Sequence, residues 1–253
     1  MAVHFIHVSK TGGTALRYAL RQARTNAEGK LSSPYGPVWA YRHKFRFCDV
    51  PKGDKAVFAL RDPASRFVSG FYSRLRKGAP RHMREWSEEE RRSFEWFRTP
   101  QALADALAEP PGETRERAEF ALRSIGHLRR PMSFWTGTPS YLRRHLDRVL
   151  YVARQETLDD DWERLKELLG LPPEQMLPRD ELTAHRTTYT DDRELSEAGK
   201  RALRAWYADD YEVLEIGEAV RNGRVPSPGS RLGRLALSAR GTPLFKVGRL
   251  EHS

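Results

Sequence analysis

One segment near the start of the chain combines glycines, hydroxyls and a cation in a pattern that suits phosphate binding. It reads Ser9-Lys10-Thr11-Gly12-Gly13-Thr14 and lies between an apolar run and a run of helical composition. Backbone N–H groups at the start of a helix form a cradle for phosphate oxygens, and glycines let the backbone approach them closely. The charge of Lys10 and the hydroxyls of Thr11 and Thr14 would add contacts. The segment predicts a phosphate-binding loop, with a tight turn and a solvated lysine as the alternative.

The order of residues in this loop bears on the class of enzyme. Its lysine precedes the glycines, whereas the Walker pattern G-x-x-x-x-G-K-[ST] places the lysine after them. A nucleotide or small-molecule kinase of P-loop type would also need an acidic magnesium ligand after a strand, and the sequence shows neither feature. We therefore keep such a kinase only as an alternative.

A second pattern, Arg61-Asp62-Pro63 through Ser69, follows another apolar run. An arginine that leaves a strand presents a planar fork of donors to a phosphate, and Ser69, two turns into the next helix, can point to the same side. Asp62 and Pro63 are typical of a helix start, so the alternative is a capped helix with a solvated arginine. We expect Arg61 and Ser69 to bind a second phosphate.

The elements that must position these residues follow from hydrophobic patterning. Strands are expected at 3–8, 55–60 and 148–153, and helices at 14–24, 65–76, 158–169 and 195–214. A mostly helical insert between 86 and 146 is broken by prolines at 100, 110, 111 and 131. Strands that alternate with helices predict an α/β fold, a largely parallel sheet flanked by helices, with ligands at the carboxyl ends of the strands.

Together the two motifs resemble those of a known family. The segment Lys10–Thr14 resembles the 5′-phosphosulfate loop of sulfotransferases, and Arg61 with Ser69 resembles their 3′-phosphate site. In context, both are similar to sulfotransferase family 2, which includes carbohydrate sulfotransferases such as heparan sulfate 2-O-sulfotransferase. Ser9 stands where many relatives carry proline. Weaker similarity extends the resemblance over residues 3 to 216, through the segments Arg154–Leu158, Arg186–Thr188 and Tyr207–Tyr211.

This resemblance implies a P-loop-like sulfotransferase domain over residues 1–217, with a helical insert. The enzyme would transfer a sulfuryl group from 3′-phosphoadenosine 5′-phosphosulfate (PAPS) to a hydroxyl of a carbohydrate or glycoconjugate. Lys10 would neutralise the leaving 5′-phosphate oxygen. No metal is expected, since no cluster of His, Cys, Asp and Glu with ligand spacing occurs. The cofactor-binding residues implied are Lys10, Thr11, Gly12, Gly13, Thr14, Arg61, Ser69, Arg186 and Thr187.

A histidine between the two motifs often serves as the base in the resembled family. His43 occupies that place, with Arg42 where a glycine frequently stands. An imidazole suits the role because its unperturbed pKa of about 6.5 leaves it largely neutral at pH 7. His127, in Gly126-His127-Leu128, is the alternative base, and a surface or structural role is the alternative for His43.

The net charge of +10 and the pI near 9.9 indicate an anionic partner. Part of the excess lies in residues 218–253, where cations occur among Gly, Pro and Ser, which predicts a flexible basic tail able to contact an anionic membrane or polymer. Charge alone would also suit a nucleic-acid-binding module, a second alternative. The two motifs favour a nucleotide cofactor instead, and no nucleic-acid partner is expected.

Compartment and redox chemistry follow from composition. No run approaches the roughly 20 apolar residues of a membrane-spanning helix, and the first residues lack the layout of a signal peptide. We therefore expect a cytoplasmic protein, peripheral to a membrane where the tail binds one. The single cysteine, Cys48, cannot form an internal disulfide and is expected to act as a small buried side chain instead of a nucleophile.

Overall fold

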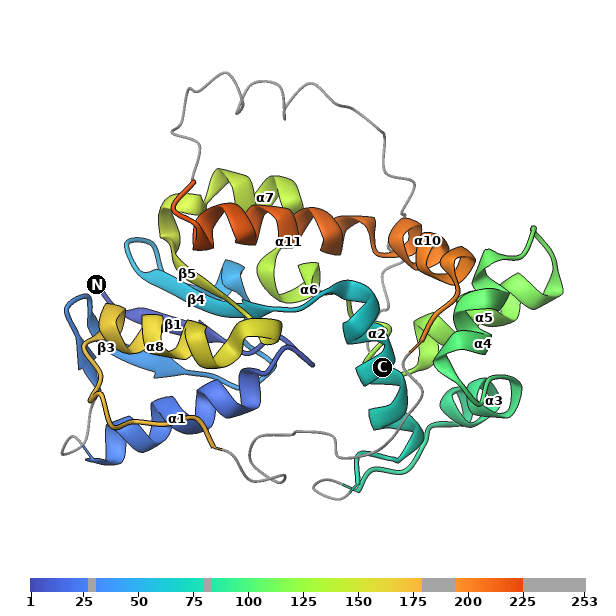
Figure 1. Cartoon of the computed structure of the whole chain (residues 1–253), viewed down its shortest axis with the longest axis horizontal. Helices are drawn as coiled ribbons and strands as arrows, with labels where there is room; N and C mark the ends of the chain where they lie inside the picture. Colours follow the sequence, from blue (N-terminus) through green and yellow to red (C-terminus); the bar gives the residue numbers. More distant parts are fainter. Residues whose placement is uncertain (27–30, 80–82, 179–193, 225–253) are drawn as a thin grey trace, which may run out of the picture.

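The computed structural model describes residues 1–26, 31–79, 83–178 and 194–224. Within these residues a five-stranded sheet has the order β2-β3-β1-β4-β5 (Figure 1). Strand β1 pairs in parallel with β3 and β4, and β4 pairs in parallel with β5, whereas β2 and β3 are antiparallel. This confirms the α/β class. The strands are β1 Val3–Ile6, β2 Ser32–Ser33, β3 Gly36–Ala40, β4 Lys55–Leu60 and β5 Val149–Arg154.

Both faces of the sheet are covered, because side chains that alternate along each strand enter two separate cores. Phe5 and Val57 pack with helices α1 (Gly13–Asn26) and α8 (Leu158–Leu169) on one face. Ile6 and Phe58 pack on the other face with α6 (Ser133–Thr136), α7 (Pro139–Arg144) and α11 (Ala208–Arg221). Figure 1 shows α1 and α8 on one side of the sheet and α7 and α11 on the other.

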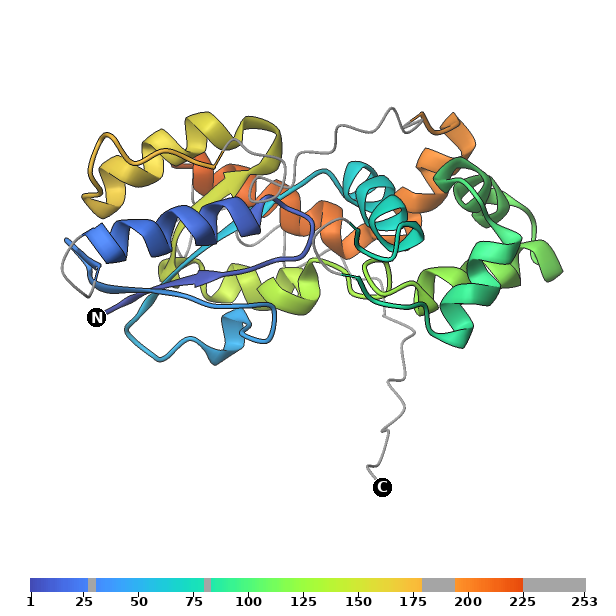
Figure 2. The same ribbon diagram turned by 90° about the horizontal axis from the view of Figure 1, so that it is seen from below.

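The remaining helices form a lobe beside the sheet, with a third core (Figures 1 and 2). Its residues include Phe71, Phe94, Leu103 and Leu203, all fully buried. Helix α2 enters the lobe directly from β4, so one helix joins the sheet to the insert. The lobe helices are α2 Pro63–Leu75, α3 Glu88–Trp96, α4 Pro100–Ala108, α5 Glu113–Ser124 and α10 Glu197–Trp206.

Most sequence-based elements are confirmed, with three differences. Strand β1 ends at Ile6, because the N–H of Val8 turns back to the carbonyl of Ile6 (3.1 Å). Strands β2 and β3 were not predicted. The expected helix at 195–214 is two helices, α10 and α11, since the chain breaks at Tyr207; α11 then continues to Arg221, beyond the predicted domain end at 217. The predicted tail falls largely on residues 225–253, outside the described ranges.

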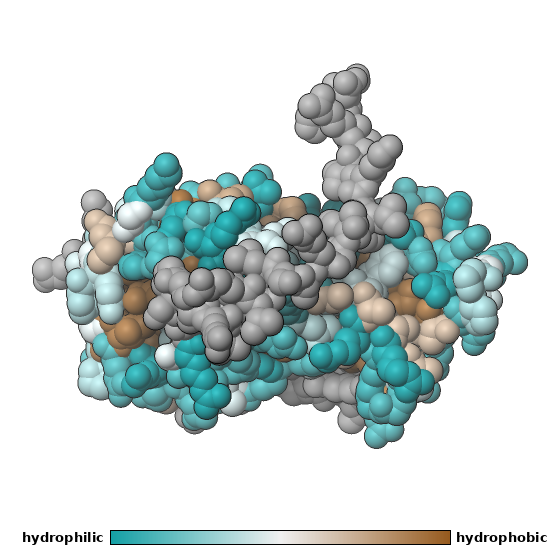
Figure 3. Space-filling model, turned by 90° about the horizontal axis from the view of Figure 1, so that it is seen from above, coloured by the Kyte–Doolittle hydropathy of each residue, from teal (hydrophilic) through white to brown (hydrophobic). Residues whose placement is uncertain are grey.

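The surface agrees with the polar composition. On the face shown in Figure 3, hydrophilic side chains predominate and apolar colour is confined to small areas. No helix among the described residues is both long enough and apolar enough to cross a bilayer.

Candidate functional site

The loop between β1 and α1 lies at the carboxyl end of the central strand. Lys10 and Gly12 adopt positive φ angles of 67° and 79°, which turn the chain sharply before α1 begins at Gly13. The first turn of this helix contains no acidic residue. The N–H groups of Ala15 and Leu16 donate to the carbonyl of Gly12 (3.1 and 3.4 Å), which leaves those of Gly13 and Thr14 to an added acceptor, and the helix dipole favours negative charge at this end. The loop therefore has the backbone arrangement of an anion cradle.

Gly13 is required for the shape of this loop. A Cβ atom there would lie 2.3 Å from Cδ2 of His7, and one at Gly12 would lie 2.7 Å from Cδ2 of Leu158. Such distances are impossible without movement of the neighbouring side chains. Both glycines thus keep the loop backbone free of side chains where it borders the cavity described below.

The two loop threonines have different environments. Thr11 is fully buried, and its hydroxyl donates to the carbonyl of Val8 (3.1 Å), so this side chain closes the loop on itself. Thr14 lines the cavity, with its hydroxyl 3.5 Å from Nε2 of His7. Only the Thr14 hydroxyl therefore faces a ligand space as predicted, whereas Thr11 could contribute through its backbone.

A cavity of about 1460 Å³ opens beside the loop and continues between the sheet and the helical lobe. It gathers side chains from both predicted phosphate motifs and both candidate bases. Arg186 and Thr187 lie outside the described residues. The predicted residues in its wall are Lys10, Gly12, Gly13, Thr14, His43, Arg61, Ser69 and His127.

Positive charge predominates in this cavity. Ten lysine and arginine side chains line it, against five aspartate and glutamate side chains, among the described residues. Burial, followed by the charges of Arg61, Arg76 and Arg66, lowers the pKa of Lys10 to about 8. An anion would relieve this repulsion, since an opposite charge favours the protonated amine. The electrostatics of the wall therefore suit an anionic ligand.

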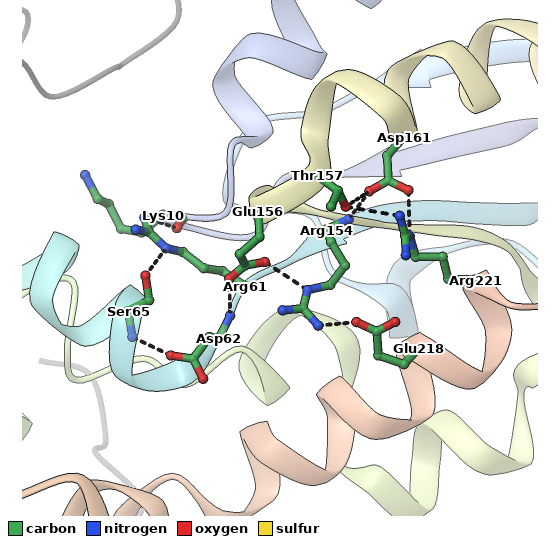
Figure 4. A network of polar contacts seen from close by, with 10 residues as sticks. All are labelled: Lys10, Arg61, Asp62, Ser65, Arg154, Glu156, Thr157, Asp161, Glu218 and Arg221. Atoms are coloured by element: carbon green, nitrogen blue, oxygen red, sulfur yellow. Dashed lines mark hydrogen bonds and ion pairs between the residues drawn. The ribbon is translucent and has the colours of Figure 1, made fainter. Parts of the chain in front are cut away.

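Arg61 connects the two phosphate motifs. Its Nε donates to Oγ of Ser65 (3.0 Å), and its Nη1 lies 3.5 Å from the carbonyl oxygen of Lys10 (Figure 4). Asp62 caps α2 by accepting from the N–H of Ser65 (2.7 Å), with Pro63 at the first helical position. The segment therefore caps α2, as the sequence predicts, and also places Arg61 in the cavity wall.

A chain of charged contacts behind Arg61 was not predicted. Glu156 accepts from the N–H of Asp62 (2.8 Å) and from Nε of Arg154 (2.9 Å), and Arg154 also pairs with Glu218 on α11 (Figure 4). Burial alone would raise the pKa of Glu156, but the hydrogen bonds from Arg154 and from backbone N–H groups outweigh it and lower that pKa. Glu156 lies in the Arg154–Leu158 segment that the sequence analysis singled out. Its backbone partner, Asp62, is 94 residues away in sequence, so the contact could not be predicted.

Next to this chain, Asp161 is a buried structural carboxylate. It accepts from Oη of Tyr151 (2.5 Å), from Oγ1 of Thr157 (2.8 Å) and from Nε of Arg221 (2.7 Å; Figure 4). Burial and the adjacent carboxylate raise the pKa of Tyr151 to about 12. These contacts attach the last turn of α11 to α8 and β5.

His43 presents an exposed side chain to the cavity. Its Nδ1 must carry hydrogen, because it donates to the backbone carbonyl of His7 (3.0 Å), so the neutral ring keeps a lone pair on Nε2. The ring centroids of His43 and His7 lie 3.9 Å apart. Trp135 donates from Nε1 to the carbonyl of His43 (2.8 Å). Partial burial lowers the pKa of His43, and nearby arginines add to this, while the His7 carbonyl acts in the opposite sense.

His127 reaches the same cavity from the segment after α5. Its Nδ1 lies 3.2 Å from Oγ of Ser9, the residue that opens the loop. Burial and the surrounding positive charges, with Lys10 the foremost, hold the pKa of His127 well below its usual value. The ring is therefore neutral near pH 7. Sequence order placed His127 after both motifs, yet the fold brings it to the phosphate loop.

The fully buried Arg66 joins these segments. Its Nε donates to the carbonyl of Ser9 (2.9 Å) and its Nη2 to the carbonyl of Arg130 (2.7 Å), while Asp210 lies 3.9 Å from Nη1. Asp210 in turn accepts from the N–H groups of Met132 and Ser133. Arg66 lies within the second motif, but the sequence gives no sign that it connects these segments.

Cys48 is exposed, contrary to the burial expected from the sequence, and does not line the cavity. It lies in the 3-10 turn Phe47–Asp49, and its Sγ is 3.6 Å from Oδ1 of Asp49.

Comparison of the chain with protein-family models, with curated proteins and with solved structures found no match.

Proposed function

We propose that this protein is a PAPS-dependent sulfotransferase with a P-loop-like core. One observation carries the proposal. The loop after β1 and the Arg61–Ser69 segment after β4 resemble two separate phosphate sites, and both line a single cationic cavity that also contains His43. The two sites would hold the two phosphate-bearing ends of one nucleotide.

The residues in the cavity wall fit such a nucleotide. The N–H groups of Gly13 and Thr14, together with Lys10, would hold the 5′-phosphosulfate, in a loop where a Cβ at Gly13 would collide with the His7 ring. Arg61 and Ser69 would hold the 3′-phosphate. PAPS supplies the activated sulfuryl group, while the chain orients it and compensates negative charge on the leaving phosphate, chiefly through Lys10.

His43 is the proposed base for the acceptor hydroxyl. Its Nδ1–H is fixed on the His7 carbonyl, which leaves Nε2 as the atom that accepts the proton. A lowered pKa keeps this nitrogen unprotonated at neutral pH. The acceptor class that we propose is a hydroxyl of a carbohydrate or glycoconjugate; a cytoplasmic location and a membrane- or polymer-binding role for residues 218–253 are further proposals.

Ligand-induced stabilisation tests the proposal directly. Adenosine 3′,5′-bisphosphate should raise the melting temperature well above the effect of AMP at equal concentration, because only the bisphosphate occupies both sites. Transfer of label from sulfur-labelled PAPS to a panel of glycan acceptors would establish the reaction. Equal shifts of the melting temperature with AMP would overturn the two-site assignment. A larger shift with ATP and magnesium would favour a kinase. Salt-sensitive retention on DNA without nucleotide binding would favour a nucleic-acid-binding module.

A further inference from the structure

The contact between Ser9 and His127 joins two parts of the cavity wall that are 118 residues apart in sequence. Ser9 is 5% exposed, and its backbone carbonyl is held by Arg66. The same guanidinium lies 3.5 Å from the carbonyl of His127. Both residues are therefore fixed through their backbones as well as through the contact between their side chains.

Close packing on α2 also restricts His127. A Cβ atom at Gly70 would lie 3.1 Å from Cβ of His127 and 3.0 Å from Cδ2 of Leu128. Tyr207 donates to the carbonyl of Leu128 (3.1 Å), which holds the next residue of the segment. The imidazole thus sits on a rigid backbone beside Ser69, the predicted 3′-phosphate contact.

The second ring nitrogen of His127 is available to a ligand. Nδ1 contacts Ser9, whereas Nε2 makes no hydrogen bond within the described residues. His127 lines the cavity, so Nε2 is the ring nitrogen left for a ligand there. Burial, followed by the charges of Lys10 and Arg66, holds the pKa of His127 well below its usual value, so the ring meets a ligand in its neutral form.

A neutral imidazole has one N–H, and the ligand decides where it resides. If the Ser9 hydroxyl donates to Nδ1, then Nε2 carries the hydrogen and can donate to an anionic oxygen. We infer that Ser9 and His127 form a pair in which an anion bound at the Ser9–Thr14 loop selects the Nε2–H form of the imidazole as its hydrogen-bond donor, while the Ser9 hydroxyl supports that form by donating to Nδ1. This deepens the proposed function and rests on it for the identity of the anion as a phosphosulfate.

The pair differs in role from His43. The His7 carbonyl fixes hydrogen on Nδ1 of His43 and leaves Nε2 as an acceptor, whereas the Ser9 hydroxyl can donate to Nδ1 of His127 and leave Nε2 as a donor. With the anion bound, the two histidines would therefore take opposite tautomers, one suited to receive a proton and the other to stabilise negative charge.

Nitrogen-15 NMR of histidine-labelled protein tests the inference without turnover. Addition of adenosine 3′,5′-bisphosphate, or of inorganic sulfate as a second probe, should shift His127 to the Nε2–H tautomer and leave the His43 tautomer unchanged. In Ser9→Ala the tautomer preference should disappear, and the affinity for the bisphosphate should fall about 2- to 10-fold, the effect of one hydrogen bond.

Two substitutions of His127 separate donation from a structural role. His127→Gln places an amide N–H near the position of Nε2, so it should retain affinity for the bisphosphate. His127→Asn can still contact Ser9 but loses the donor, so it should bind the bisphosphate about 10- to 100-fold more weakly. Higher affinity of the Asn variant, or an Nδ1–H tautomer in the complex, would overturn the inference while leaving the proposed function intact. A response of His127 to sulfate without any nucleotide binding would overturn the proposed function and support the pair; no response to either probe would overturn both.

Discussion

The side chain of Glu156 accepts a hydrogen bond from the backbone N–H of Asp62, 94 residues earlier in the chain, over 2.8 Å. Asp62 is the N-cap of α2 and directly follows Arg61. The contact therefore fixes the point where β4 ends and the Arg61 side chain leaves the backbone. Glu156 is itself held by Arg154, so the position of Arg61 depends on the loop that follows β5.

Glu156→Ala should weaken binding of adenosine 3′,5′-bisphosphate by about 2- to 10-fold, because Arg61 loses a fixed backbone. Binding of AMP should change less, since it lacks the 3′-phosphate. Isothermal titration calorimetry of both ligands measures the difference. Glu156→Gln, which keeps an acceptor for Asp62, should restore most of the loss, and Glu167→Ala, on the exposed side of α8, is the control. Equal losses for both ligands would contradict a role through Arg61.

Arg61→Ala should remove about 1.5 to 3 kcal/mol of binding free energy for adenosine 3′,5′-bisphosphate, the typical contribution of hydrogen bonds to charged groups. AMP affinity should remain close to that of the wild type, which calorimetry can establish for the two ligands side by side. Arg98→Ala, an exposed arginine outside the cavity wall, controls for the loss of one positive charge. Unchanged bisphosphate affinity would remove Arg61 from the site.

His43→Ala should lower turnover by ~10² to 10⁴-fold while the bisphosphate affinity stays nearly constant, because a base acts on the reaction more than on cofactor binding. Because the pKa of His43 is lowered, the wild-type rate should fall only as pH drops below about 6.5. This acid limb should be absent in the variant. His145→Ala, a histidine that packs on Tyr141 outside the cavity wall, is the control. Near-normal turnover of His43→Ala would place the base elsewhere.

Lys10 should take up a proton when an anionic nucleotide binds. Its pKa of about 8 means that roughly half of the free protein carries a neutral amine at pH 8, and the phosphates, by favouring the cation, should raise that pKa. Calorimetry at pH 8 in buffers of different ionisation enthalpy should therefore show net proton uptake. Lys10→Arg, which keeps a permanent charge, should abolish the uptake while retaining binding. Proton release by the wild type would contradict this assignment.

Gly13→Ala should destabilise the fold by about 1 to 3 kcal/mol, the usual effect of forcing extra volume into a packed site. The new methyl group would press on His7, whose ring lies against His43. Chemical denaturation gives the change in stability, and the His43 resonances report whether the ring moves. Gly53→Ala is not a matched control, because Gly53 has a positive φ of 86°. Gly112 has an extended backbone and open surroundings but is the N-cap of α5, so Gly112→Ser, which keeps a favourable cap while adding a side chain, is the control. A stable Gly13→Ala with unmoved histidines would show that the loop accommodates a side chain.

The local parts of the fold and site could be predicted from the sequence. The apolar runs at 3–8 and 55–60 contain strands β1 and β4, and α8 occupies the expected residues 158–169. Strand β3 was missed because Gly36-Pro37 is atypical of a strand, and its pairing with β1 depends on tertiary contact. The local sequence of a segment does not reveal a strand that is stabilised mainly by its partner.

In the candidate site, too, local patterns could be predicted from the sequence and tertiary contacts could not. Lys10, Gly13 and Arg61 could be predicted as neighbours in one cavity wall because a glycine-containing loop and a helix start are local patterns. The contact of Ser9 with His127 could not, since it depends on how the helical insert packs against α2. Thr11 shows the converse: a hydroxyl in a suitable motif turns inward when its own loop offers a carbonyl.

Arg66 has a consequence for how sequences of this fold can diverge. Its guanidinium contacts carbonyls of the phosphate loop and of the segment after α5, and a buried aspartate on α11 backs it. Substitutions at the exposed positions of α3, α4 and α5 leave these contacts in place, whereas loss of Glu90, which accepts from the N–H of Gly126 (2.9 Å), or a change in the length of the segment 126–130 would displace the cavity wall. Over evolutionary time, therefore, we expect the outer helices of the insert to vary in sequence and length, while 126–130 keeps its length and Arg66 and Asp210 change only together.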